Sequence, residues 1–169
     1  DIQNILNAEA ELTHKSQPSP VILSTRVRLA RNLDGYPFPG WARENQRREI
    51  QGMCKDALAA LPVMQEAHVV EIGELSALEK QVLVERHLIS RELSQSETGS
   101  AVIISKDQSA AVMINEEDHM RIQVVRSGFH FRKIWKVIDG IDTGLEDHLD
   151  MAFSQELGYL TACPTNVGP

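Results

Sequence analysis

Two apolar runs separated by a short polar turn place the strongest constraint on how this chain can fold. Residues 101–105 read Ala-Val-Ile-Ile-Ser and residues 111–115 read Ala-Val-Met-Ile-Asn, with Lys-Asp-Gln-Ser at 106–109 between them. Apolar, β-branched runs of this length on both sides of a turn predict an antiparallel hairpin. Residues 120–125 predict a third strand, which extends the hairpin into a meander. We therefore expect an antiparallel sheet.

The other segments are predicted from periodicity and from turn residues. Helical spacing of apolar residues predicts helices over 41–61, ended by Pro62, and over 76–93. Residues 129–138 and 145–157 are also predicted to be helical, with the turn-rich segment 139–144 between them. Residues 21–29 and 68–72 are predicted strands, and 34–40 a loop. The predicted class is α+β, an antiparallel β-sheet flanked by helices.

The length of 169 residues suffices for one domain with an apolar core. Residues 1–13 have the apolar spacing of a short amphipathic helix, and residues 16–20, which contain two prolines, end it. We therefore expect an N-terminal helix and linker over 1–20 and the globular part over 21–169.

Composition excludes several classes of protein. The chain has 24 acidic and 17 basic residues and a net charge of −7, which argues against a nucleic-acid binder that works by bulk electrostatics. No apolar run approaches the ~20 residues of a membrane span, and the first residues lack a signal-peptide layout, so we expect a cytoplasmic protein without membrane partners. Cys54 and Cys163 lie too far apart to indicate a disulfide framework or a metal site.

Arginines interrupt the predicted strand over 21–29. Residues two apart in a strand share a face, so Arg26 and Arg28 lie on the same side. Guanidinium groups placed in this way can make bidentate contacts to phosphate oxygens. The alternative is a solvated strand face whose arginines pair with surface acids, and composition alone favours that alternative.

Glu116, Glu117, Asp118 and His119 directly follow the second strand of the predicted hairpin. Strand alternation predicts that Glu117 and His119 share a face with Arg121, so that a carboxylate and an arginine point into one space. Three consecutive acids repel one another unless they are exposed to solvent or bind a cationic ligand. An acidic hairpin end without a function is the alternative interpretation.

Cys163 precedes a proline, and small polar residues and a glycine follow. This pattern is typical of an exposed thiol on a rigid loop. A lone cysteine is more often a small buried apolar residue, so a structural role is the alternative here as well.

Taken together, four motifs resemble the phosphagen (guanidino) kinase superfamily. They are Ser-Thr-Arg-Val-Arg-Leu-Ala-Arg-Asn at 24–32, Gly-Tyr-Pro-Phe-Pro at 35–39, Asn-Glu-Glu-Asp-His-Met-Arg at 115–121 and Gly-Tyr-Leu-Thr-Ala-Cys-Pro-Thr-Asn-Val-Gly at 158–168, in the order of the family. Three features are similar to the bacterial protein-arginine kinases in particular. They are the short segment before the first motif, the residues Glu-Arg-His-Leu-Ile-Ser at 85–90 and the exact sequence of the last motif. The resemblance covers residues 21–168.

The resemblance implies transfer of the γ-phosphoryl group of Mg-ATP to a guanidino nitrogen, and in the bacterial branch to arginine side chains of proteins. Residues 21–169 would be the N-terminal portion of an ATP:guanido phosphotransferase catalytic domain. Mg²⁺ is held mainly through the nucleotide in this family, so no protein metal site is expected. By motif position the ATP-binding residues are Ser24, Thr25, Arg26, Val27, Arg28, His87 and Arg121.

The acceptor guanidinium is a poor nucleophile because its pKa lies above ~12. By the family pattern, Glu117 is the carboxylate that orients it and takes or shares a proton. Cys163 matches the reactive cysteine of the family, whose thiolate assists placement of the guanidinium. The expected partners are protein substrates that carry arginine, and a second copy of the chain or an activator protein is a further candidate.

The chain departs from the family pattern at its end. Family members continue into further phosphate-binding arginines and strands, and Pro169 stands where the family has threonine. A fragment of a longer kinase and a naturally short protein are alternatives. Neutralisation of the triphosphate charge is the main catalytic effect. We therefore expect these 169 residues alone, with an incomplete set of phosphate-binding arginines, to bind nucleotide weakly and to catalyse little phosphoryl transfer.

Two other functions remain open at this point. One is a kinase of a small guanidino metabolite. The other is a non-catalytic, kinase-like module that binds a partner through an open sheet edge.

Overall fold

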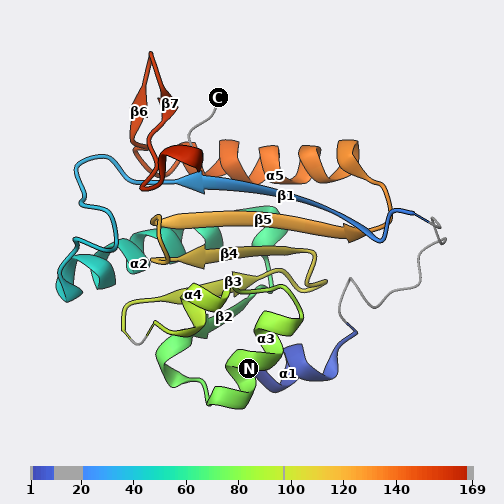
Figure 1. Ribbon diagram of the computed structural model, residues 1–169. Coiled ribbons are helices and arrows are strands. Elements are labelled where there is room, and N and C mark those ends of the chain that lie inside the picture. Colours follow the sequence, from blue (N-terminus) through green and yellow to red (C-terminus); the bar gives the residue numbers. More distant parts are fainter. Residues whose placement is uncertain (1, 10–20, 97, 167–169) are drawn as a thin grey trace.

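Helices cover both faces of one antiparallel sheet in the computed structural model, which describes residues 2–9, 21–96 and 98–166 (Figure 1). The strands of the sheet are β1 (Ser24–Arg31), β2 (His68–Glu71), β3 (Ala101–Ile104), β4 (Ala110–Ile114) and β5 (Met120–Ser127), in the order β1-β5-β4-β3-β2. The α-helices are α1 (Ile2–Asn7), α2 (Glu44–Ala59), α3 (Ala77–Glu85), α4 (Arg91–Ser94) and α5 (Phe131–Glu146). Shorter elements are the 3₁₀ turns at Pro62–Met64, Ile72–Glu74 and Pro164–Asn166 and the hairpin of β6 (Phe153–Ser154) and β7 (Gly158–Tyr159).

The predicted meander forms the centre of this sheet, which confirms the α+β prediction. β3 pairs with β4 so that Val102 lies opposite Met113, and β4 pairs with β5 so that Val112 lies opposite Ile122. β1 pairs with β5 and lies at one edge of the sheet. None of the described helices is long and apolar enough to cross a membrane.

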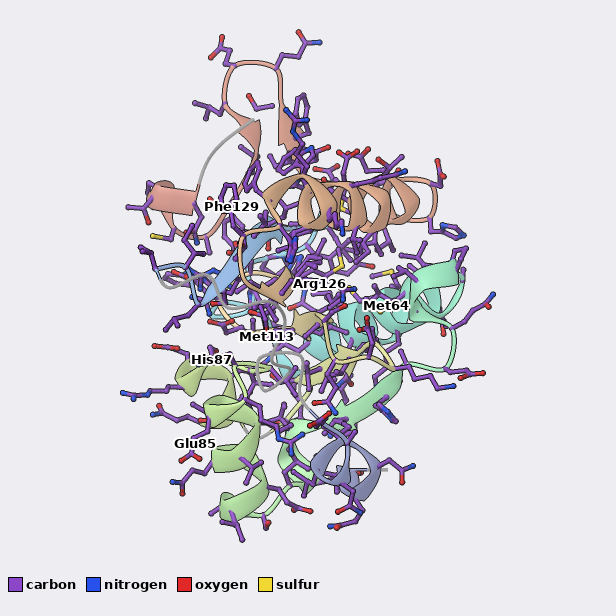
Figure 2. All side chains as sticks on the ribbon, turned by 90° about the vertical axis from the view of Figure 1, so that its right-hand side faces the viewer. Met64, Glu85, His87, Met113, Arg126 and Phe129 are labelled. Carbon is purple, nitrogen blue, oxygen red and sulfur yellow. The ribbon has the colours of Figure 1, made fainter. Side chains whose placement is uncertain are left out.

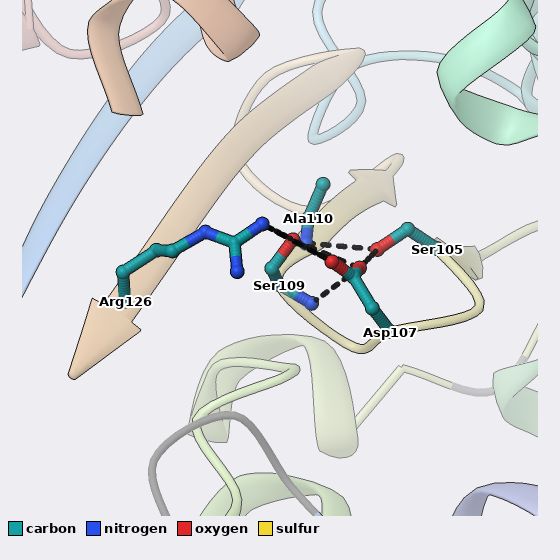
Figure 3. A network of polar contacts seen from close by, with 5 residues as sticks. All are labelled: Ser105, Asp107, Ser109, Ala110 and Arg126. Carbon is teal, nitrogen blue, oxygen red and sulfur yellow. Dashed lines mark hydrogen bonds and ion pairs between the residues drawn. The ribbon is translucent and has the colours of Figure 1, made fainter. Parts of the chain in front are cut away.

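One carboxylate stabilises the turn between β3 and β4 (Figure 3). Asp107 accepts hydrogen bonds from the hydroxyl groups of Ser105 and Ser109 at 2.7 and 2.8 Å, and Arg126 of β5 donates to it at 3.2 Å. Partial burial acts to raise the pKa of Asp107, but these hydrogen bonds hold it below its usual value. The carboxylate therefore ties the turn to the next strand in its charged form.

The two faces of the sheet carry two apolar cores. The larger core joins α2 and α5 to β3, β4 and β5, and Val27 and Leu29 of β1 pack against it. The second core joins α1, α3 and α4 to side chains of β2, β3 and β4. On this second face β1 and β5 carry mainly polar side chains, so the helices leave part of the sheet uncovered.

The structure corrects the prediction for residues 139–157. The segment 139–144 is not a turn, because α5 continues through Gly140 and Gly144 to Glu146, and residues 153–159 form the β6–β7 hairpin instead of a helix. Four buried residues, Ile134, Ile138, Ile141 and Leu145, keep helical spacing across both glycines. Their burial outweighs the cost of about 1 kcal/mol for each glycine in a helix.

The predicted helix over 76–93 is also wrong as one element. α3 ends at Glu85, His87 takes a left-handed φ of 58°, and α4 begins at Arg91 after its N-cap, Ser90. Elsewhere the elements are correct and their bounds differ: β1 spans 24–31 instead of 21–29, and α2 spans 44–59 instead of 41–61. α1 ends at Asn7, and residues 10–20 of the predicted lead lie outside the described residues.

The continuous helix α5 predicts that Gly140→Ala stabilises the protein. A Cβ at position 140 meets no atom within 4 Å, so the substitution gains about 0.5–1 kcal/mol of helix propensity. A Cβ at Gly144 would lie 2.6 Å from Cδ2 of Leu61, so Gly144→Ala, the matched control, gains less or destabilises. Urea unfolding measures both, and a destabilising Gly140→Ala would indicate a turn at this position.

Candidate active site

Arginines gather on the part of the sheet that α3 and α4 leave uncovered. Arg26 and Arg28 share this face, as strand alternation predicts, and both are exposed. In the β1–β5 register Arg28 lies opposite Gln123 and Ala30 lies opposite Arg121, so Arg121 is the diagonal neighbour of Arg28. Strand pairing therefore brings together the three arginines that were predicted to bind ATP.

These three guanidinium groups affect one another electrostatically. Partial burial, and then the charges of Arg26 and Arg121, lower the pKa of Arg28. Like charges held this close repel one another, so an anion bound among them is stabilised by all three. The cluster is therefore suited to a polyanion such as a chain of phosphates.

His87 lies over this cluster at the corner between α3 and α4. Gln123 of β5, which is buried, donates from Nε2 to the His87 carbonyl at 2.5 Å and so ties the corner to the sheet. In Figure 2, Glu85 and His87 lie at the end of α3, with Met113 beyond them toward the strands. Arg26, Arg28, His87 and Arg121 line one cavity of about 470 Å³.

A second cavity, of about 800 Å³, adjoins the first. Glu116 and Glu117 line it, together with Arg47 of α2. Four residues line both cavities: Arg28, Ser90, Glu92 and Arg121. The two cavities therefore meet at Arg28 and Arg121, with Glu116 and Glu117 on one side of these arginines and His87 on the other.

The acidic residues between β4 and β5 form a turn, which corrects the predicted strand alternation. Asn115 takes a left-handed φ of 56° and ends β4, so residues 116–119 have no regular strand faces. Arg121 Nη1 donates to Glu116 Oε1 at 2.8 Å, so Glu116 and not Glu117 pairs with this arginine. Burial raises the pKa of Glu116 more than Arg121 lowers it. Glu117 is exposed at the cavity.

The two residues after Glu117 point into the protein. His119 is fully buried, and its Nδ1 accepts a hydrogen bond from the backbone N–H of Leu33 at 2.9 Å. Burial lowers the pKa of His119. Asp118 is 3% exposed, and its Oδ1 accepts from Asn32 Nδ2 and from the backbone N–H of Ala162, both at 2.7 Å. These two side chains therefore stabilise the turn that presents Glu117.

Cys163 lies near the same turn. The hydrogen bond from Ala162 to Asp118 joins the residue before Cys163 to the residue after Glu117. The Cys163 thiol is partly exposed, and its sulfur lies 2.9 Å from Oγ1 of Thr165. Cys54 is buried in the larger core, where burial raises the pKa of its thiol to about 12. Cys163 is therefore the more reactive of the two thiols.

Thr25, Val27 and Arg31 lie on the opposite face of β1, toward α5. Thr25 Oγ1 donates to the carbonyl of Gly128 at 2.6 Å and accepts from the backbone N–H of His130 at 3.1 Å. Val27 packs against the larger core. The same alternation separates Arg31 from the arginine cluster.

Arg31 is 5% exposed and connects β1 to α5. Its Nε and Nη2 donate to both oxygens of Asp142 at 2.8 and 2.5 Å, and its guanidinium lies 3.5 Å from the ring centroid of Tyr159.

Of the five residues predicted to bind ATP at 24–28, Arg26 and Arg28 line the cavities, and Ser24 is exposed at the start of β1, opposite Ser127.

Two buried amides that organise the site were not predicted from the sequence. They are Gln123, which ties the His87 corner to β5, and Asn32, which binds the turn after β4. The signal in the sequence is weak: one amide interrupts the apolar residues of β5, and the other directly follows β1. Buried amides need hydrogen-bond partners, but the sequence does not say which groups supply them.

Comparison with known proteins identifies the family. Residues 49–169, more than half of the chain, match the family model described as ATP:guanido phosphotransferase, C-terminal catalytic domain. The chain belongs to the ATP:guanido phosphotransferase family. This confirms the resemblance inferred from the four motifs.

The relatives that this family member matches include named kinases. It is 39% identical over 170 residues to a protein-arginine kinase of Pelotomaculum thermopropionicum, covering 98% of this chain and 48% of the relative. It is 44% identical over 153 residues to a protein-arginine kinase of Symbiobacterium thermophilum, covering 88% of this chain and 43% of the relative. The chain thus spans about half the length of the curated relatives it matches.

A solved structure confirms the fold of this family member. The duplicated taurocyamine kinase of Schistosoma mansoni with bound transition-state-analog components superposes with a TM-score of 0.83 at 27% identity. The superposition covers 93% of this chain and 24% of the other. The antiparallel sheet with helices on both faces is therefore the fold of this family.

The contacts of Thr25 predict that its hydroxyl group stabilises the fold. Thr25→Val leaves the Gly128 carbonyl and the His130 N–H without this partner, which costs about 1–3 kcal/mol of unfolding free energy. Thr25→Ser keeps the hydroxyl group and most of the stability. Urea unfolding compares the two variants, and equal stabilities would show that the hydroxyl has no structural role.

Proposed function

We propose that this chain supplies the nucleotide clamp and the acceptor carboxylate of a protein-arginine kinase, which transfers the γ-phosphoryl group of ATP to arginine side chains of proteins. The observation that carries the proposal is that Arg28 and Arg121 line both cavities. A phosphoryl group that moves from a nucleotide in one cavity to an acceptor in the other passes these two guanidinium groups. The names of the relatives support the class of acceptor.

The smaller cavity is the proposed nucleotide side. Arg26, Arg28 and Arg121 would neutralise the phosphate oxygens, and His87 would contact the nucleotide from the α3–α4 corner. Phosphoryl transfer depends mainly on positioning and charge neutralisation, which this cluster provides. Thr25 and Val27 face α5, so any contact of these two residues with ATP would involve the backbone of β1; Ser24 remains a proposed contact.

The larger cavity is the proposed acceptor side. A protonated guanidinium has no lone pair available for attack, so a carboxylate must orient it and take or share its proton. Glu117 is exposed at this cavity, whereas the Glu116 side chain is 4% exposed and paired with Arg121. Glu117 is therefore the better placed of the two to accept this proton. Cys163 would assist from the neighbouring segment as a thiolate beside the cation.

Mg²⁺ would enter this site on the phosphates of the nucleotide, since this ion keeps several waters and uses few protein ligands in phosphoryl-transfer sites. It would neutralise charge on the transferred group. The carboxylates that line the larger cavity, Glu92, Glu116 and Glu117, are the side chains available to hold its waters. Among the described residues, no three His, Cys, Asp or Glu side chains are arranged so that they could hold a metal ion directly.

We also propose an extent for the domain and a set of partners. Residues 21–169 would form the N-terminal portion of the catalytic domain, preceded by the helix and linker over 1–20. Its partners would be protein substrates that carry arginine, and a second copy of the chain or an activator protein is a further candidate. We propose the cytoplasm as its location.

A kinase of small guanidino compounds is the second candidate. One observation favours it: a solved structure that this chain resembles at 27% identity is named as a taurocyamine kinase. An assay that offers an arginine-containing protein and free arginine side by side separates the two candidates. Phosphorylation of the protein alone supports the first, and phosphorylation of free arginine alone supports the second.

The role of Glu117 predicts that Glu117→Gln reduces phosphoarginine formation at least ~100-fold, because the amide cannot take the proton. Binding of ATP stays within about 2-fold. The assay uses the complete polypeptide that the reading frame encodes, and calorimetry measures its binding of ATP. Glu156→Gln, at an exposed position between β6 and β7, is the matched control and retains activity. Near-normal transfer by Glu117→Gln would show that another group is the base.

The arginine cluster predicts that Arg26→Ala weakens ATP binding at least ~10-fold, because one charge-assisted contact to the phosphates is lost. Arg132→Ala, on the exposed surface of α5, is the control with an equal change of charge and leaves the ATP dissociation constant unchanged. Calorimetric titration of ATP into both variants measures the difference. An equal effect of the two substitutions would indicate a general charge effect instead of a clamp.

A further inference from the structure

Asn32 lies where the two proposed catalytic segments meet. It directly follows β1, is 2% exposed, and contacts both the 115–119 turn, which contains Glu117, and the 160–163 segment, which contains Cys163. Neither proposed catalytic residue belongs to β1. Asn32 therefore joins parts of the chain that are far apart in sequence.

The side chain of Asn32 makes three hydrogen bonds. Its Nδ2 donates to Asp118 Oδ1 at 2.7 Å and to the carbonyl of Leu160 at 3.0 Å. Its Oδ1 accepts from the backbone N–H of His119 at 2.8 Å. Its backbone carbonyl also accepts from the N–H of Ala152 at 2.8 Å, which brings the C-terminal segment to the end of β1.

Asp118 completes this network. The oxygen that accepts from Asn32 also accepts from the backbone N–H of Ala162 at 2.7 Å. Glu117 precedes Asp118 in the chain and Cys163 follows Ala162, so each proposed catalytic residue lies one peptide unit from this hydrogen bond. A shift of Asp118 would therefore move Glu117 relative to Cys163.

We infer that Asn32 is a positioning residue, which holds Glu117 and Cys163 in the relative placement that phosphoryl transfer to the acceptor requires. The inference rests on the proposed function. An amide suits this position because it donates to a carboxylate and accepts from a backbone N–H at the same time. A carboxylate at position 32 would lose both donated bonds and would repel Asp118.

The backbone of the nucleotide clamp does not depend on this network. Arg26, Arg28 and Arg121 are placed by the pairing of β1 with β5. Loss of the Asn32 bonds therefore lowers kcat and leaves the KM for ATP nearly unchanged. A displacement of about 1 Å at reacting groups can cost 10²-fold in rate.

A charge-swapped pair tests the inference in the complete polypeptide. Asn32→Asp reduces kcat at least ~100-fold, with the KM for ATP within about 2-fold. Adding Asp118→Asn restores the bond between the two side chains, because the new amide at 118 donates to the carboxylate at 32. The N–H groups of His119 and Ala162 keep their acceptors at 32 and 118 in both variants. The double variant N32D/D118N therefore recovers kcat to within ~10-fold of the wild type.

Thiol alkylation supplies a readout that does not need phosphoryl transfer. Iodoacetamide labelling, followed by mass spectrometry of each peptide, is expected to show a changed rate at Cys163 in N32D and a restored rate in the double variant. Cys54 is the internal control because it is buried and reacts only when the fold opens. Equal gains in labelling at both cysteines would mean general unfolding and would overturn the inference.

Two further results would also overturn it: normal kcat in N32D, or a double variant no more active than N32D. If the wild type transfers no phosphoryl group to protein arginine, the proposed function fails. In that case the labelling rate of Cys163 in the wild type, N32D and N32D/D118N still tests whether the Asn32 network holds the Cys163 segment in place.

Discussion

The antiparallel pairing of β1 with β5 is the interaction on which the rest of the site depends. Its register places Arg28 opposite Gln123 and Ala30 opposite Arg121, so arginines from two distant segments share one face. The same alternation turns Val27 and Leu29 into the larger core. Apolar burial on one face thus provides the free energy that holds three like charges together on the other.

The helices decide which part of that face remains open. α1, α3 and α4 pack on β2, β3 and β4 through the second core and leave β1 and β5 uncovered. The corner between α3 and α4 then overhangs the arginines, because Gln123 binds the His87 carbonyl. The proposed nucleotide site lies at the border of the helical layer because of this partial cover, and the acidic turn after β4 closes the other side.

Sequence reasoning succeeded where one element determines the outcome. The shared face of Arg26 and Arg28 depends on the two-residue period of a single strand, and the meander depends on apolar runs next to each other in sequence. Glu117 and Arg121 line one cavity, as predicted. The prediction failed for His119, which is buried away from them because residues 115–119 form a turn instead of a strand. It also failed at Gly140, where burial of the apolar stripe of α5 overrides a turn-forming residue.

The sequence by itself determined the class of fold, the family and the residue types that are proposed to carry the chemistry. These depend on local periodicity and on motifs whose residues are close together in the chain. Only the tertiary structure decided which residues meet: Glu116 with Arg121, Arg31 with Asp142, and Asn32 with Asp118. The physical reason is that a buried polar group must find a partner, and in the last two pairs that partner comes from a distant segment of the chain, so no local pattern encodes the choice.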